Sequence, residues 1–217
     1  FKYNSFATNA ADVVHRLTRD VDARIAARSD TDAPLPPILA LKSTVDDTVT
    51  TDAIVDNLLS LLTPRRHELV LFDVNRYDSK ASLLVADPGP LTDRLLGDDS
   101  LPFALTVITN RDSKTRDVVA RHKEALSADV VNEELPDLAW PNDVFSLSHV
   151  ALPFAPDDPL YGSNPPIGDN TLHLGDIPLR GERDLNKISG EWLLRMRYNP
   201  FYDVLESRIV AWLESID

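Results

Sequence analysis

The segment PILALKSTVDDTV, residues 37–49, decides the fold class of this chain. Its first seven residues are mostly apolar and too few for a helix, so they predict a short buried strand over 37–43. Residues 51–62 then repeat apolar side chains at helical spacing, with Thr51 as the expected N-cap and Pro64 as the end. The next segment, HELVLFDV (67–74), predicts a strand buried on both faces. Strand, helix, strand indicates a right-handed crossover in an α/β sheet.

The segments on either side extend this pattern. A further strand is expected over 103–109 and a short helix near 91–97, while 130–140 is ambiguous. Longer helices are expected over 9–27, 113–126 and 201–213, with apolar faces that include Leu17 in the first and Val118, Val119 and His122 in the second. We therefore predict an α/β fold, a mostly parallel sheet with flanking helices. Residues 1–217 form either a single domain or the carboxyl-terminal part of a larger one.

Composition narrows the class of protein. Hydrophobic residues make up 43% and charged residues 26%, which is ordinary for a folded domain. With 22 basic and 35 acidic residues the net charge is −13, so nucleic acid is a poor partner. No apolar run approaches the roughly 18 residues of a membrane span. The absence of Cys excludes disulfides and thiolate metal sites, and it fits a reducing compartment such as the cytoplasm.

Two acids follow the first predicted strand directly, Asp46 and Asp47. Asp is common in solvated turns, and that is the ordinary interpretation of such a pair. However, ligands and catalytic groups gather at the carboxyl ends of strands in open α/β sheets, where a carboxylate can orient an imidazole. We take Asp46 as the candidate acid and Asp47 as the alternative, because Asp46 comes before a short run that turns inward at Val49.

The candidate general base is His149. It ends the apolar run FSLSHVALPF (145–154), and the turn-rich segment APDDPLYG (155–162) then carries the chain away. An acid after one strand and a His after a later one follow the chain order of the second and third members of a Ser-Asp-His triad. The other histidines have structural interpretations: His15 and His122 lie in predicted helices, and His67 opens a strand. No His pair has metal-site spacing, so no metal or other cofactor is predicted.

A nucleophile is harder to find. A strand-to-helix elbow needs small residues around the Ser, as in Gly-x-Ser-x-Gly. The seven Gly include no pair four residues apart, and Ser5, Ser29 and Ser43, which precede Asp46, are not in an elbow context. The chain opens on Phe1 and its one Met is Met196. We therefore expect the nucleophile and the oxyanion-hole loop in sequence upstream of Phe1.

These motifs resemble the carboxyl-terminal half of an α/β-hydrolase fold serine hydrolase of the lysophospholipase or esterase type. The resemblance is carried by residues 38–49, by SLSHV (146–150) with DDPLYG (157–162), and by RMRYNPF (195–201) with the last helix. It implies a small ester or acyl substrate, Asp46 as orienting acid, His149 as general base and no cofactor. The extra strand at 103–109 and the missing elbow depart from the family pattern.

The resulting hypothesis is part of a serine hydrolase that cleaves a carboxylic ester or related acyl bond and is inactive as this chain alone. Its expected macromolecular partner is its own upstream half or a second copy, because a halved parallel sheet exposes an apolar edge. The alternative is a non-catalytic, acidic α/β interaction module. A receiver-like domain that uses Asp46 and Asp47 fits less well, since the acids follow the wrong strand and no Lys follows a last strand.

Overall fold

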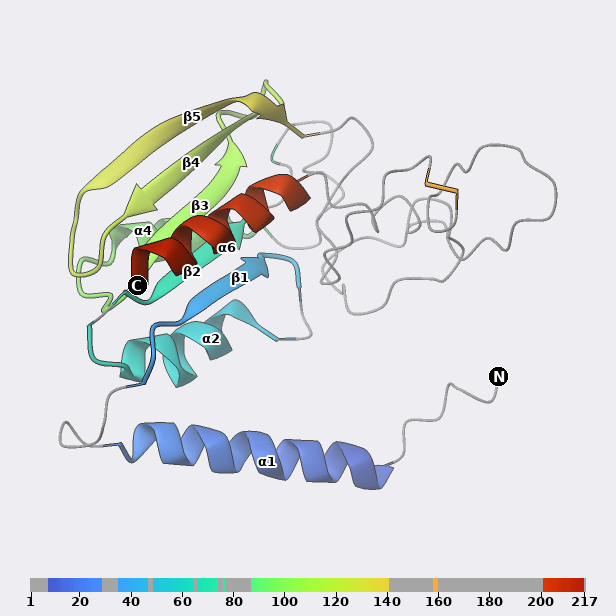
Figure 1. The fold of residues 1–217 in the computed structure, drawn as a ribbon, viewed down its shortest axis with the longest axis vertical. Coiled ribbons are helices and arrows are strands. Elements are labelled where there is room, and N and C mark those ends of the chain that lie inside the picture. Colours follow the sequence, from blue (N-terminus) through green and yellow to red (C-terminus); the bar gives the residue numbers. More distant parts are fainter. Residues whose placement is uncertain are drawn as a thin grey trace.

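The computed structural model describes residues 8–28, 35–46, 49–64, 66–73, 76, 87–140, 158–159 and 201–216. Within these residues the strands form one sheet of five, in the order β1-β2-β3-β4-β5 (Figure 1). The strands are β1 (Leu39–Ser43), β2 (Glu68–Phe72), β3 (Ala104–Asn110), β4 (Asp117–Lys123) and β5 (Val130–Ala139). The helices are α1 (Thr8–Ala26), α2 (Thr51–Asn57), the 3-10 turn η1 (Leu59–Leu61), α4 (Gly89–Gly97) and α6 (Tyr202–Ile216).

The first three strands form the parallel half of the sheet. β1 pairs with β2 and β2 with β3, both in parallel, and α2 and α4 connect them. The α/β class is therefore confirmed, as are the strands predicted at 37–43, 67–74 and 103–109 within a few residues at their ends. The N-cap of α2 is Thr50 and not Thr51: the Thr50 Oγ1 accepts a hydrogen bond from the Ala53 N–H at 3.3 Å. Thr51 is the first helical residue and is buried.

The other half of the sheet corrects the prediction of a mostly parallel sheet. β3–β4 and β4–β5 pair antiparallel, and the helix expected over 113–126 is wrong because β4 occupies 117–123. A tight turn precedes β4, in which the Asp112 carboxylate accepts from the N–H groups of Lys114 (2.7 Å) and Thr115 (3.1 Å). So short a connection only allows an antiparallel neighbour. The ambiguous segment 130–140 is strand β5.

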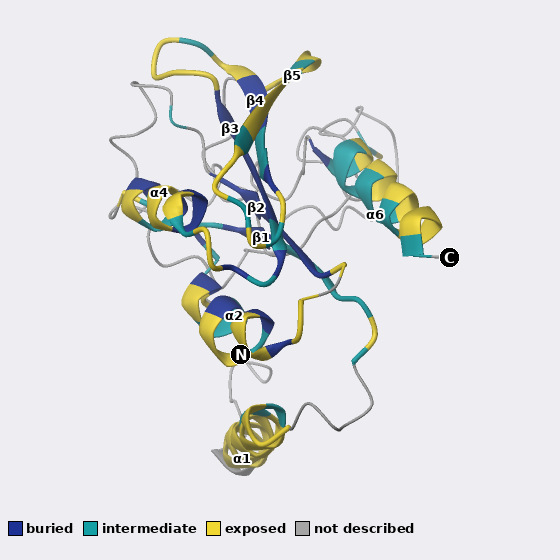
Figure 2. Cartoon of the chain, turned by 90° about the vertical axis from the view of Figure 1, so that its left-hand side faces the viewer, coloured by how far each residue is buried: buried dark blue, intermediate teal, exposed yellow. Residues whose placement is uncertain are grey.

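Burial on both faces explains why β2 is mostly apolar. All five residues of β2 are buried, as the sequence predicts. Leu69 and Leu71 join the core cluster under α2 and α4, while Val70 and Phe72 join a second cluster on the opposite face. The second cluster also contains Trp140 and Phe201, and α6 lies over that face (Figure 2).

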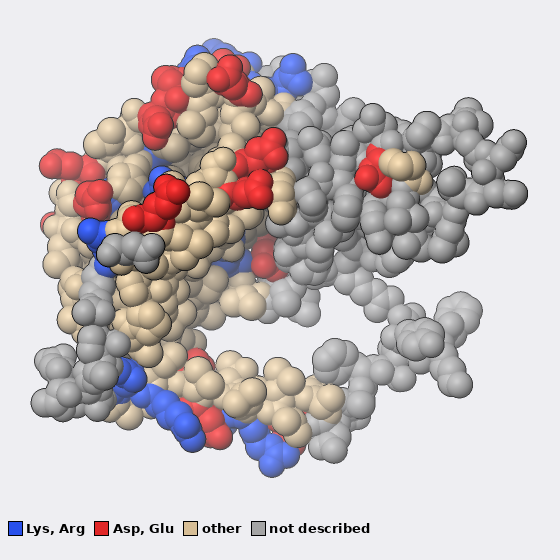
Figure 3. Space-filling view, in the orientation of Figure 1, with Lys and Arg blue, Asp and Glu red and all other residues tan. Residues whose placement is uncertain are grey.

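Helix α1 does not bury the apolar face that its sequence presents. It lies beside α2 and away from the sheet (Figure 1). Val13, Val14, Leu17 and Val21 are 44–61% exposed, so the expectation of an inward face is wrong for the described residues. On the face shown in Figure 3, α1 carries several basic groups, and acidic groups lie over α6 and the nearby strands. None of the described helices is long and apolar enough to cross a membrane.

A buried lysine closes the carboxyl end of α4. Lys123 is 1% exposed, and its ammonium donates to the backbone carbonyls of Leu95 (2.7 Å), Leu96 (3.2 Å) and Asp98 (2.5 Å). These carbonyls belong to the last turn and C-cap of α4, where the helical hydrogen bonds end, and the Leu95 carbonyl also accepts from the Asp98 N–H at 3.4 Å. We expect Lys123→Met to lower the free energy of unfolding by about 2–3 kcal/mol, because several acceptors lose their donor while the desolvation cost of the ammonium is relieved.

Urea denaturation of Lys123→Met would measure this loss. The matched control is Lys114→Met, an exposed lysine in the β3–β4 turn, for which a change within about 0.5 kcal/mol is expected. If both variants unfold like the unmodified protein, Lys123 is not what stabilises the end of α4.

Candidate active site at the carboxyl edge of the parallel strands

Three polar segments meet at one edge of the sheet because β1, β2 and β3 run in the same direction. Asp46 lies in the turn after β1, Asp73 directly after β2, and Thr109 and Asn110 end β3. Backbone hydrogen bonds of the sheet extend one residue beyond the strands at this edge. The Thr44 N–H donates to the Phe72 carbonyl at 3.0 Å, and the Asp73 N–H donates to the Ile108 carbonyl at 2.9 Å. We call this region the carboxyl edge. It is where an α/β sheet most often places catalytic groups.

Asp46 lies at the predicted strand end, where a buried lysine holds its turn. The Lys42 ammonium donates to the carbonyls of Asp46 (2.7 Å) and Ser43 (3.2 Å). It also lies 3.7 Å from the Asp46 Oδ2, and the Asp46 side chain is 15% exposed. The lysine therefore fixes the turn and partly neutralises the carboxylate.

His149 and the alternative acid Asp47 both lie outside the described residues. A carboxylate–imidazole hydrogen bond of about 2.6–3.2 Å therefore stays a prediction.

A second carboxylate, which sequence reasoning missed, lies at the centre of the carboxyl edge. Asp73 is buried; its Oδ2 accepts from the Thr109 hydroxyl (3.1 Å) and from the Arg76 Nε (2.8 Å), and its Oδ1 from the Thr44 hydroxyl (3.4 Å). The sequence prediction counted Asp73 as part of the strand over 67–74. Its position after the most apolar strand was the available signal, because strand ends of this kind carry functional groups.

Arg76 links Asp73 to the start of α4 through two ion pairs. Its Nη1 contacts the Asp87 carboxylate at 2.6 Å, and the same Asp87 oxygen accepts from the Gly89 N–H at 2.9 Å. A Cβ on Gly89 would lie 2.9 Å from the Arg76 Nη1, so a larger residue here would shift the end of the Arg76 side chain. The Arg76 N–H also donates to the Asn110 Oδ1 at 2.6 Å, which joins the ends of β2 and β3.

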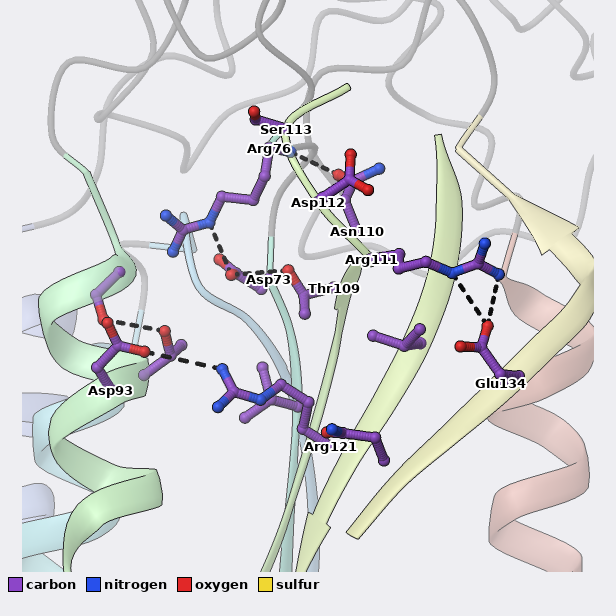
Figure 4. A pocket seen from close by; sticks show the side chains of 15 residues that line it. Asp73, Arg76, Asp93, Thr109, Asn110, Arg111, Asp112, Ser113, Arg121 and Glu134 are labelled. Atoms are coloured by element: carbon purple, nitrogen blue, oxygen red, sulfur yellow. Dashed lines mark hydrogen bonds and ion pairs between the residues drawn. The ribbon is translucent and has the colours of Figure 1, made fainter. Parts of the chain in front are cut away.

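A cavity of about 430 Å³ opens beside Asp73, between α4 and the strands β3, β4 and β5 (Figure 4). Each guanidinium of its lining has a carboxylate partner: Arg76 with Asp73, Arg111 with Glu134 at 2.5 Å, and Arg121 with Asp93 at 3.8 Å. The charges largely offset one another, and hydroxyl and amide groups lie between them. Such a lining suits a polar ligand of low net charge, and its volume is that of a small-molecule site.

Burial raises the pKa of the Asp73 carboxyl above its ordinary value, and the Arg76 guanidinium and the two hydroxyls only partly oppose this. The folded protein therefore holds this proton to a higher pH than the unfolded chain does. The contribution of Asp73 to stability is largest below the unfolded pKa and is lost as the pH rises through the folded pKa.

We expect the stability of Asp73→Asn, relative to the unmodified protein, to increase as the pH rises from the ordinary pKa of Asp, about 4, through the raised pKa of the folded protein, because Asn does not titrate. Urea denaturation at a series of pH values measures this difference. If the difference in free energy of unfolding between the two proteins stays constant or falls with pH, then folding does not favour the protonated form of Asp73.

Two of the three described histidines, His67 and His122, have structural contacts. The His67 Nδ1 accepts from the Ile38 N–H at 3.1 Å, which joins the amino ends of β1 and β2. His122 lies on β4, not on a helix as predicted, where its Nδ1 is 2.9 Å from the Thr106 hydroxyl and its Nε2 is 3.1 Å from Glu124. His15 is exposed on α1. Among the residues that the structure describes, no three His, Cys, Asp or Glu side chains are placed to hold a metal ion.

Comparison with known proteins gives no relative: no family model, curated protein or solved structure matches this chain. The site must therefore be interpreted from its own geometry.

Proposed function

We propose that this chain supplies the acid and the histidine of a Ser-Asp-His triad in a hydrolase that cleaves a carboxylic ester or related acyl bond. In this proposal a Ser from polypeptide outside the 217 residues attacks the carbonyl carbon, and His149 takes its proton. Asp46 holds the imidazole in the right tautomer and stabilises its charged form. His149 then returns the proton to the leaving group.

One observation carries this proposal: Asp46 lies in the turn that follows β1, at the edge where three parallel strands end. An acid in this position can reach groups that follow neighbouring strands, and its side chain is only partly exposed. The cavity beside Asp73 supports the proposal, since it gives a small polar substrate room at the same edge. The sequence SLSHV (146–150) around His149 also supports the proposal, because it resembles the segment that carries the histidine in serine hydrolases of this fold.

The second candidate is the non-catalytic interaction module. The contacts of Lys42 favour it, because this ammonium lies against both the carbonyl and the carboxylate of Asp46. A carboxylate shared with a lysine is a weaker partner for an imidazolium. In this interpretation Asp46 is a structural part of the turn.

A fluorophosphonate probe separates the two candidates, because it labels only an activated Ser. The protein translated from its complete reading frame is expected to take up about one probe per chain. Labelling should be lost in His149→Ala and kept in His15→Ala, a matched change at an exposed histidine on α1. The 217-residue chain alone should stay unlabelled, because loss of the nucleophile of such a triad costs about 10⁶ in rate.

Two results would contradict the hydrolase proposal. One is a folded complete protein that takes up no probe, which would favour the interaction module. The other is labelling that does not depend on His149, or labelling of the 217-residue chain by itself. Far-ultraviolet circular dichroism of each variant shows whether a loss of labelling comes from loss of folding.

A further inference from the structure

The cavity beside Asp73 contains one guanidinium whose hydrogen-bond donors are unused. Arg76 and Arg111 each donate to a carboxylate at hydrogen-bond distance, 2.8 and 2.5 Å. Arg121 also lines the cavity, but within the part of the chain that the structure describes it makes no hydrogen bond, and its ion pair with Asp93 spans 3.8 Å. A guanidinium has five N–H donors in a fixed plane. Those of Arg121 are therefore open to a ligand.

The Arg121 side chain can be reached from the cavity. On β4 it lies between Val107 of β3 and Asn132 of β5, the residues directly opposite it in the two neighbouring strands, and all three line the cavity. The side chain is 37% exposed. Figure 4 shows its guanidinium pointing into the space between β4 and α4.

Asp93 faces this guanidinium from the opposite wall. It lies on α4, and its side chain is 74% exposed (Figure 4). An exposed ion pair at 3.8 Å, longer than a hydrogen bond, contributes little to stability. Sharing the two charges of this pair with a ligand therefore costs the protein little.

The two charges select the kind of ligand. A carboxylate can accept two parallel hydrogen bonds from a guanidinium, which a hydroxyl group cannot do. A simple anion, however, would lie beside the Asp93 carboxylate in a protein of net charge −13, and a simple cation would lie beside Arg121. A ligand that carries both charges close together pairs with both side chains at once and has no net charge.

We propose that this cavity binds a zwitterionic α-amino acid with an uncharged side chain. The carboxylate accepts hydrogen bonds from the Arg121 guanidinium and the ammonium donates to the Asp93 carboxylate, so that the four charges alternate in sign. The side chain of the ligand lies over Val107 and Val119, which line the same wall and are almost fully buried. The volume of about 430 Å³ is within the range of small-molecule sites.

The rest of the lining explains why the side chain of the ligand carries no charge. Arg76 and Arg111 already have carboxylate partners, so a further charge on the ligand would have no unpaired group to meet. The inference goes beyond the proposed function, because it assigns a ligand to the cavity whether or not an acyl bond is cleaved beside it.

The test is isothermal titration calorimetry of the 217-residue protein at low salt with L-threonine, L-glutamine and L-leucine, whose uncharged side chains differ in polarity. At least one of them is expected to saturate a single site. Its N-acetyl derivative lacks the positive charge and its amide lacks the negative charge. At pH 6.5, where the amine of the amide is charged, each derivative should bind at least about tenfold more weakly.

Variants on the two walls locate the site. Arg121→Gln should weaken binding of the amino acid at least about tenfold. Asp93→Asn should weaken it similarly but strengthen binding of the N-acetyl derivative, because the guanidinium then has no carboxylate beside it. The matched controls are Arg94→Gln and Asp52→Asn. These residues form an exposed ion pair of 2.8 Å between α4 and α2, outside the lining, and the changes should leave binding unaltered.

The proposal is overturned if none of the three amino acids saturates, or if Arg121→Gln binds the amino acid as tightly as the unmodified protein does. Equal affinity for the amino acid and its N-acetyl derivative would also overturn it, because Asp93 would then play no part. Urea denaturation of each variant confirms that the compared proteins are folded. Since the readout is binding, failure of the hydrolase proposal would not affect the result.

Discussion

Asp46→Asn is expected to lower kcat/KM for an activated ester by about 10⁴-fold in the protein translated from its complete reading frame. An amide at this position keeps the size of the side chain but no longer stabilises the imidazolium of His149, and it favours the wrong tautomer. The effect should appear in kcat rather than in KM, because the acid acts on the transition state. Steady-state kinetics with a p-nitrophenyl ester measure it.

Asp73→Asn is the matched control for this prediction. Asp73 is a buried carboxylate at the same edge, but its oxygens already accept from Thr109, Arg76 and Thr44. We expect a less than tenfold loss of kcat/KM. A larger loss for Asp73→Asn than for Asp46→Asn would make Asp73 the orienting acid and would contradict the assignment to Asp46.

The stability of Asp46→Asn must be measured in parallel. The substitution also removes the 3.7 Å ion pair with Lys42, for which we expect a loss of about 1–3 kcal/mol, because the pair is largely buried and the lysine keeps only its hydrogen bonds to two carbonyls. A loss of activity at a temperature where the variant is folded can then be assigned to catalysis.

Phe201→Ala is expected to lower the free energy of unfolding by about 3–5 kcal/mol, the range for a fully buried Phe in a close-packed core. Phe201 is fully buried just before α6. Its ring centroid lies 4.3 Å from that of Trp140, edge to face, and 6.2 Å from that of Phe72. The ring therefore attaches α6 to the sheet, because the helix buries no residue of its own.

Urea denaturation measures this loss, with Leu213→Ala as the control. Leu213 is a large apolar residue on the same helix but is 50% exposed, so a change of less than about 1 kcal/mol is expected. If Phe201→Ala costs no more than Leu213→Ala, the attachment of α6 does not depend on the aromatic cluster.

The sequence by itself determined the parallel half of the fold and the position of Asp46. The strands near 37–43, 67–74 and 103–109 could be predicted because each is a short apolar run between polar breaks, a pattern set by neighbouring residues. Asp46 could be placed at a strand end for the same reason. The final helix, confirmed as α6, has a local apolar period that needs no tertiary contact to be seen.

Only the tertiary structure decided the rest. Val118, Val119 and His122 have a spacing that fits a helix as well as a strand, and pairing with β3 makes the segment β4. Asp73 became a candidate site residue because three strand ends bring Thr44, Thr109 and Arg76 to it from separate parts of the chain.

The tertiary structure also decided the contacts of charged side chains. Lys123 and Arg208 look like ordinary surface residues in the sequence, yet Lys123 donates to the end of α4 and Arg208 to the buried Glu68. Conversely, the apolar face of α1 predicts burial, but within the described residues no strand lies under it. A residue's own neighbours set its secondary structure, whereas its partners across space, which no local pattern contains, set its burial and its chemistry.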